Sequence, residues 1–540
     1  MIAVNDNYIK KYIIVYFSKA SEYFQRFEKN QYFLFFLFTV SLFWPILLNG
    51  GVYIFGDSPG YLNGGRLALD FAFDHVGRIF SPQGGDAATG TSGGGSAGVS
   101  GVRSIVFSVY AGITRHPGHS MFVMCLLQAG LTLYVLWLLL RLTEISRVPS
   151  ATVLILLTTA LLSPVAWFVV LVMPDIYAGL ALASIMLLTY FNDRLVVTEK
   201  VVLAGVIGFS VANHLSHPPI FGLLTALSGL LFLRRCTKVD WKRHMVAFSW
   251  VALPALLGLC AMIGANAVGF KQTSVSGKRY PIVLASSIQA GPARWYLKKA
   301  CAETPEVYAV CEVYKAVPMP DTSGEFLFGV NGVRQRATPE QMERIRNEEG
   351  TILKNATLAY PWVTISAAVG RSAFQFVRIG LDDHRFDNRL LVQPDGSVRA
   401  SETYDPKPLF KRFFRILFGL ELLAGVIFFV WVFKKRPFAP ISPIYGLLWF
   451  SGMGVLINAF VCGAMSAVTD RYQGRIIWVF LTVCLIAGAE LWRLRARTPK
   501  LAEPAKVIEE PRSIEVVSRR SKRRQMAKRS RAGKNTSASK

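Results

Sequence analysis

Charged residues are scarce in this chain of 540 residues: they make up 17% of it, whereas 52% is hydrophobic. So low a charge content excludes a disordered chain, and the hydrophobic excess excludes a single soluble core. Only seven cysteines are present, which excludes a disulfide-rich secreted scaffold. The composition instead predicts an all-α polytopic membrane protein.

Long apolar runs give the expected spans, because about 20 apolar residues cross a hydrocarbon core of roughly 30 Å. Windows of this length predict helices at 32–51, 120–140, 151–173, 176–191, 245–268, 412–433, 441–464 and 476–493. The run 201–233 is too long for one upright helix, and prolines 218 and 219 interrupt it. Read as a hairpin of two short spans, it raises the total to about ten transmembrane helices.

Acidic residues are few, 34 against 60 Lys and Arg, and the basic excess is uneven. With ten spans and the N-terminus inside, the cytoplasmic segments hold 33 basic residues and the short outer loops hold six. This distribution follows the positive-inside rule. We therefore expect a multi-pass protein of a bacterial inner membrane with both termini cytoplasmic. Its first span would be a retained signal anchor.

This topology divides the chain into five regions. They are a cytoplasmic N-terminal segment (1–31), a transmembrane region (32–268), a periplasmic domain (269–411), C-terminal transmembrane helices (412–493) and a disordered basic cytoplasmic tail (494–540). Outer loop 55–118 contains a Gly- and Ser-rich tract at 84–101 that cannot bury a core. The segment 269–411 is long enough for a small mixed α/β domain. The tail suits attraction to anionic membrane lipids, and no nucleic-acid partner is expected.

Two cysteines stand apart from those in or beside the spans. Cys301 and Cys311 both lie on the predicted outer face, ten residues apart in a polar stretch. In an oxidising periplasm this arrangement predicts a disulfide. A metal site is disfavoured there, because no His or further Cys lies nearby.

One segment after these cysteines has the pattern of an amphipathic helix. Between residues 361 and 379, one helical face carries Trp362, Ile365, Val369, Phe376 and Val377. The pattern suits a helix in the bilayer interface or a helix packed on the periplasmic domain, and both interpretations stay open.

Ionisable side chains lie beside the outer ends of several predicted spans. They are Asp57 with Tyr61 in Gly-Asp-Ser-Pro-Gly-Tyr, Asp175 in Met-Pro-Asp-Ile-Tyr, His214 and His217 at the hairpin tip, and Arg471, Tyr472 and Arg475 before the last span. Such groups are costly at this depth unless they are paired or functional, so we expect one shared site.

Structural explanations for the same residues stay open. Asp57 suits an ordinary turn, and Asp175 suits a cap on the helix that follows it. The two histidines suit polar lining better than metal binding, because no third ligand is apparent. Arg471 and Arg475 suit either anchors at the interface or a pair that holds a phosphate.

These features together resemble the GT-C superfamily of integral-membrane glycosyltransferases, which includes mannosyltransferase- and arabinosyltransferase-type enzymes. The resemblance rests on an acid in the first outer loop (Asp57), a second acid in the next short outer loop (Asp175), about ten spans and a soluble outer portion. It implies transfer of a hexose or pentose from a polyprenyl-phosphate donor to a glycan, lipid or protein acceptor in the cell envelope.

The resemblance carries the catalytic role to Asp57, as general base. Tyr61 would position it, Arg471, Tyr472 and Arg475 would meet the lipid phosphate, and Asp175, His214 and His217 would line the acceptor side. Many members have two adjacent acids in the first loop, whereas Ser58 and Pro59 follow Asp57 here. One carboxylate is a poor cation cage, so no metal or other cofactor is expected.

Two alternatives compete with a transferase. A transporter or flippase for a lipid-linked or anionic solute would also need charged residues near the membrane. Transporters, however, seldom need a 140-residue outer domain, and no internal repeat of halves is evident. A non-catalytic subunit of envelope assembly is the third reading.

Overall fold

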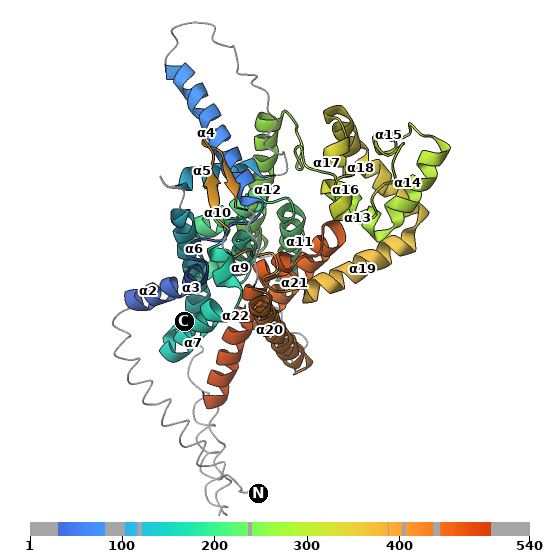
Figure 1. Ribbon diagram of the computed structural model, residues 1–540. Helices are drawn as coiled ribbons and strands as arrows, with labels where there is room; N and C mark the ends of the chain where they lie inside the picture. Colours follow the sequence, from blue (N-terminus) through green and yellow to red (C-terminus); the bar gives the residue numbers. More distant parts are fainter. Residues whose placement is uncertain are drawn as a thin grey trace, which may run out of the picture. The chain divides into compact units, whose positions relative to one another are not determined.

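The computed structural model describes residues 31–80, 103–115, 121–235, 240–386, 388–401, 407–435 and 443–497. The Gly- and Ser-rich tract at 84–101 and the basic tail from residue 498 lie outside these ranges. The described chain is mostly helical (Figure 1). Contacts between residues divide the chain into two units, Met1–Leu491 and Trp492–Lys540. The described residues of the second unit are the last residues of the final helix.

Six helices in the described ranges are long and apolar enough to cross a membrane, which indicates a multi-pass membrane protein. They are α6 (Phe122–Leu142), α9 (Ile176–Phe191, continued by the 3₁₀ turn Asn192–Arg194), α12 (Trp241–Phe270), α20 (Pro408–Lys435), α21 (Pro443–Met465) and α22 (Asp470–Arg497). Each overlaps a predicted span. The prediction of a helical membrane protein is thus confirmed at this coarse level.

Two predicted spans are divided in the structure. The first comprises α2 (Gln31–Leu42) and α3 (Trp44–Asn49), and the third comprises α7 (Pro149–Leu161) and α8 (Val165–Val169), after the 3₁₀ turn Ile145–Arg147. A continuous helix over either predicted range was therefore wrong. Pro45 and Pro164 lie at the two breaks, where a proline lacks the amide hydrogen and crowds the preceding turn.

The hairpin expected at 201–233 is present as α10 (Val197–Asn213) and α11 (His217–Arg235). His214 ends α10 with an extended backbone, and α11 begins three residues later with its prolines in the first turn. Proline is tolerated in a first turn because that amide has no helical acceptor. The two helices of the hairpin therefore meet at the histidine- and proline-containing turn, as the sequence predicts.

The outer loop expected at 55–118 contains two helices, α4 (Ser58–Phe80) and α5 (Ile105–Thr114), which pack closely together. Gly65 permits this contact, because a Cβ added to it would lie 2.0 Å from the Ser108 carbonyl oxygen. The Ser104 side chain caps α5 by accepting from the Phe107 amide. Helix α4 thereby acquires a fixed neighbour.

The range 269–411, expected as one small mixed α/β domain, has three parts. A helical cluster with its own core contains α13 (Ile282–Ala290), α14 (Pro292–Glu303), α15 (Ala309–Val313), α16 (Ser323–Phe328), α17 (Val333–Arg336) and α18 (Pro339–Ala359). The disulfide between Cys301 and Cys311 joins two of its segments. Helix α19 (Pro361–Val377) packs instead on α21.

The strands form the third part, an antiparallel hairpin of β1 (Leu390–Val392) and β2 (Val398–Ala400). It bonds to α4 rather than to the helical cluster: the Val398 amide donates to Asn63 Oδ1 at 2.8 Å, and Asn63 returns a bond to the Val398 carbonyl at 2.9 Å. The helices and strands of this range therefore do not share one core.

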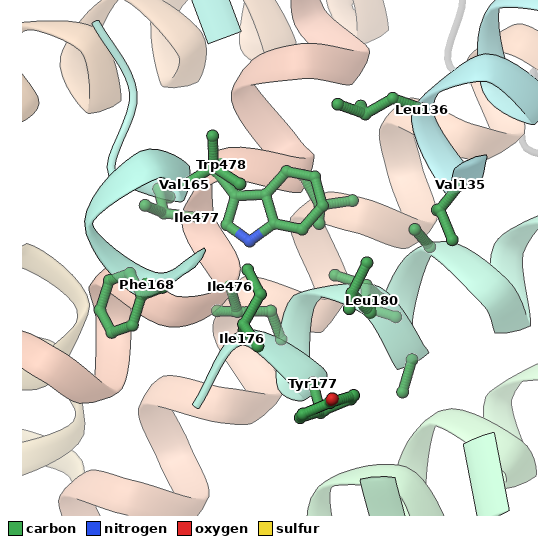
Figure 2. Close-up of a cluster of buried hydrophobic side chains, with 14 of the residues drawn as sticks. Val135, Leu136, Val165, Phe168, Ile176, Tyr177, Leu180, Ile476, Ile477 and Trp478 are labelled. Atoms are coloured by element: carbon green, nitrogen blue, oxygen red, sulfur yellow. The ribbon is translucent and has the colours of Figure 1, made fainter. Parts of the chain in front are cut away.

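The main core gathers around Trp478 of α22 (Figure 2). Its indole lies among side chains from α6, α8, α9 and α22 itself, several of which Figure 2 labels. Gly179 of α9 makes the room, because a Cβ there would lie 2.3 Å from the indole nitrogen. This packing holds the start of α22 against α9, and the candidate site is built on those two helix ends.

Candidate functional site

Asp57 and Asp175 are brought together by backbone pairing of the segments that precede them. The Val172 amide donates to the Tyr53 carbonyl at 3.0 Å, in a short parallel bridge. The Ser58 hydroxyl donates to the Val172 carbonyl at 2.8 Å. Two loops 114 residues apart are thus fixed side by side, each with its carboxylate at the start of a helix.

Asp57 contacts two guanidinium groups. Arg103 forms a close ion pair with its Oδ1, and Arg471 Nη1 lies 4.0 Å from its Oδ2. The Asp57 side chain remains 26% exposed, so it is the accessible carboxylate of the site. Tyr61, expected to position it, instead packs its ring on Phe107 and under Arg103.

Asp175 is completely buried, and it does not act as a helix cap. It occupies the N-cap position of α9, yet its side chain makes no capping hydrogen bond. Its Oδ1 lies 3.5 Å from Arg475 Nη1 and 3.8 Å from Arg471 Nε. Asp175 therefore compensates the charge of two buried arginines, which would be costly to bury without a paired anion.

Arg471 and Arg475 lie one turn apart in the first turns of α22, with Tyr472 between them. The Tyr472 ring centroid is 5.3 Å from the Arg471 guanidinium carbon and 5.0 Å from that of Arg475. Arg475 also donates to Ser216 Oγ at 2.9 Å and to Asn458 Oδ1 at 3.1 Å. Both arginines are therefore held in place by the protein rather than extended as anchors into the interface.

The start of α22 is fixed by acidic residues that the sequence analysis did not use. Asp383 accepts the Arg471 amide hydrogen at 2.9 Å, as an N-cap supplied from a distant segment. Asp470 pairs with Arg378, Nε to Oδ1 at 2.7 Å. The adjacent acids at 382 and 383 are visible in the sequence, but nothing there indicates which helix they meet.

The two histidines lie against the same arginines. His214 Nδ1 lies 2.8 Å from Ser216 Oγ, and its ring centroid is 5.1 Å from that of His217. His217 Nδ1 lies 2.7 Å from the Ser210 carbonyl oxygen and so carries the proton. Burial, the neighbouring His217 and the Arg475 cation hold the pKa of His214 well below its usual range. His214 is therefore neutral at physiological pH.

A third histidine, His384, was missed by sequence reasoning. It is buried against Tyr53, Trp167 and Phe168, with ring centroids 5.4 to 6.1 Å away. Burial, with help from Lys411 and Arg471, lowers its pKa to about 3. It follows the Asp383 cap directly, so it anchors the segment that fixes α22.

The cluster contains several buried polar atoms without hydrogen bonds. Three guanidinium groups, those of Arg103, Arg471 and Arg475, face the carboxylates of Asp57 and Asp175. Within the described ranges, Arg471 Nε and Nη1, Asp175 Oδ2 and His217 Nε2 make no hydrogen bond. Buried polar groups are normally satisfied, so these donors and acceptors are available to the polar groups of a ligand.

The part of the chain that the structure describes contains no group of three or more His, Cys, Asp or Glu side chains that could hold an ion.

Comparison with protein-family models, with curated proteins and with solved structures finds no match to this chain.

Proposed function

We propose that the chain is an integral-membrane glycosyltransferase that resembles the GT-C superfamily, taking a sugar from a polyprenyl-phosphate donor and passing it to an envelope acceptor. One observation carries the proposal. An accessible carboxylate, Asp57, lies beside buried arginines at the ends of apolar helices, and Arg471 has guanidinium hydrogens without acceptors. A base and a phosphate-binding arginine side by side are what transfer from a polyprenyl-phosphate-linked sugar requires.

In this mechanism Asp57 removes the proton of the acceptor hydroxyl as that oxygen attacks the anomeric carbon. The bond from the anomeric carbon to the phosphate oxygen breaks, and the electron pair stays on the polyprenyl phosphate. Arg471, whose Nη1 has no acceptor, stabilises that charge directly, and the fully buried Arg475 adds only its electrostatic field. The sugar is transferred with inversion, because a single displacement occurs.

The remaining residues have supporting roles that follow from their contacts. Asp175 is paired with both arginines and is too deeply buried to contact a sugar acceptor. We therefore assign it the role of positioning the arginines, in place of the acceptor-lining role expected from the sequence. His217 keeps Nε2 as an acceptor without a partner among the described residues. With neutral His214 beside it, His217 would accept a hydrogen bond from a sugar or acceptor hydroxyl.

The proposal includes the finer topology. Ten crossings would comprise the six long helices, the divided pairs α2–α3 and α7–α8, and the hairpin of α10 and α11. This arrangement leaves both termini in the cytoplasm of a bacterial cell and places the starts of α4, α9, α11 and α22 on the outer face. It is supported by the distribution of Lys and Arg.

The test is replacement of Asp57 by Asn, with Asp70→Asn as the matched control. Asp70 lies on α4, the helix that Asp57 directly precedes, and its side chain is 62% exposed in a surface pair with Arg66. Cells lacking the protein are complemented with each variant, and their lipids and envelope glycans are analysed by mass spectrometry. We expect wild type and Asp70→Asn to restore one sugar and Asp57→Asn to restore none, at equal amounts of folded protein.

Restoration by Asp57→Asn would refute the catalytic assignment. A transporter or flippase predicts another pattern: in cells lacking the protein the lipid-linked sugar would accumulate on the cytoplasmic side of the membrane, whereas loss of a transferase would let it accumulate on the outer side.

A further inference from the structure

Helix α19 has the reverse of the polarity expected of a helix at a water-exposed surface. Its exposed residues are all apolar or small, and they include Trp362 at 81%, Val369 at 59% and Phe374 at 55% exposure. The one hydroxyl among them, Ser366, donates to the Val363 carbonyl within the helix at 3.1 Å. The outward face therefore offers no free hydrogen-bonding side chain and no charge.

The polar residues of α19 point the other way, into the protein. Gln375 is fully buried and makes two bonds to Thr469: its amide nitrogen donates to the Thr469 carbonyl at 2.9 Å, and its oxygen accepts the Thr469 amide at 3.0 Å. Arg371 donates to the carbonyls of Ser286 and Ser466. In a soluble helix the apolar face turns inward and the polar face outward.

The helix on which α19 packs is itself a candidate membrane span. α19 lies along α21, where Gly463 permits close approach: a Cβ there would be 2.6 Å from the Ser372 Cα. Ser372 also lies within 3.4 Å of the Phe460 carbonyl. α21 exposes Leu456 and Phe460. The apolar outward surface therefore continues from α21, where it faces the bilayer, onto α19.

We propose that the outward face of α19 lies in lipid, at the boundary between headgroups and acyl chains. Lipid is favoured over a protein partner because a protein interface carries a polar rim with hydrogen bonds, which this face cannot supply. Trp362 and Tyr360 stand at its N-terminal end, as aromatic residues do at membrane interfaces. This inference does not depend on the proposed enzymatic activity.

A structural consequence follows from the Gln375 pair. Thr469 directly precedes Asp470 and Arg471, so a lipid-seated α19 holds the turn from which the site arginines begin. It also joins the helical cluster to the membrane region, since Arg371 bonds to residues of both.

The experiment places the photoreactive residue p-benzoylphenylalanine at position 369 of the full chain, in vesicles of phosphatidylethanolamine and phosphatidylglycerol. Position 456 on α21 is the positive control. Position 330, an exposed valine (89%) in the helical cluster, is the negative control. After irradiation, peptides are searched by mass spectrometry for adducts with the mass of a phospholipid, and size-exclusion chromatography verifies folding. Position 362 serves as a second site, should the first variant not fold.

We expect phospholipid adducts at 369 and 456 and none at 330. Adducts at 456 alone would overturn the proposal, because α19 would then face water. A cross-link from 369 to another polypeptide, or to a second copy of this chain, would also overturn it, since protein would cover that face.

Discussion

Replacing Arg475 by Met would remove one of the two cations that compensate buried Asp175. Both side chains are inaccessible to solvent, and Arg475 Nη1 lies 3.5 Å from Asp175 Oδ1. At an effective dielectric constant of about 20, unit charges at this distance attract by about 5 kcal/mol. Loss of one partner of a buried pair typically costs about 3–5 kcal/mol. Because Arg471 remains 3.8 Å from Asp175, we expect a loss near the lower limit, about 3 kcal/mol.

The matched control is Arg344→Met in the helical cluster. Arg344 pairs with Glu312 at 2.8 Å, but its side chain is 47% exposed, so its loss should cost much less than the loss of Arg475. The double variant Asp175→Asn, Arg475→Met leaves no uncompensated carboxylate. It should therefore be more stable than the sum of the two single changes predicts, as neighbouring sites in one network are not additive.

The assay heats each variant in detergent and measures the folded fraction by size-exclusion chromatography. We expect the midpoint to fall clearly further for Arg475→Met than for Arg344→Met. Equal midpoints for these two variants, or additive losses in the double variant, would show that the pair of charges does not organise the site.

Three further predictions concern packing, redox state and pH. Gly179→Ala should destabilise the protein by about 1–3 kcal/mol, because its methyl group would strike Trp478. Gly205→Ala, with nothing within 4 Å, should instead leave the thermal midpoint unchanged or raised. Reducing the Cys301–Cys311 bond should cost about 3 kcal/mol and be seen as faster proteolysis within 280–359; unchanged cleavage would contradict this. The pKa of His384 is about 3 when folded and about 6.5 when unfolded, so stability should fall as pH drops below 6.5, by up to about 1.4 kcal/mol per pH unit. His384→Gln should flatten thermal midpoints measured between pH 7 and 5, and an unchanged slope would count against it.

The sequence predicted helix positions well where long apolar runs end at charged or proline-containing turns. The run at 441–464 became α21, Pro443–Met465, and the hairpin turned at His214 as expected. It failed at Pro45 and Pro164, because hydropathy averaged over a window does not register the single missing amide that divides a helix. It also failed for 269–411, where length alone cannot show that β1 and β2 bond to α4.

The same distinction separates the site residues that were found from those that were missed. Asp57, Asp175, His214, His217, Arg471 and Arg475 stood out because ionisable groups beside apolar runs are unusual, and the structure brings these six together. Arg103 and Asp383 lie in polar segments, where a charged residue is common and does not indicate a functional site.

The interpretation of Asp175 shows why burial must be known before a role is assigned. In sequence it occupies the position of a helix cap, and a cap needs only local geometry. In the structure its nearest cations come from a helix 300 residues later, and its carboxylate makes no bond to the α9 amides. A carboxylate between two buried arginines cannot be removed without leaving uncompensated positive charge. Its replacement should therefore weaken the hold on Arg471 and Arg475, whereas loss of the partly exposed Asp57 removes only the longer 4.0 Å contact to Arg471 and should act mainly on the chemistry proposed for it.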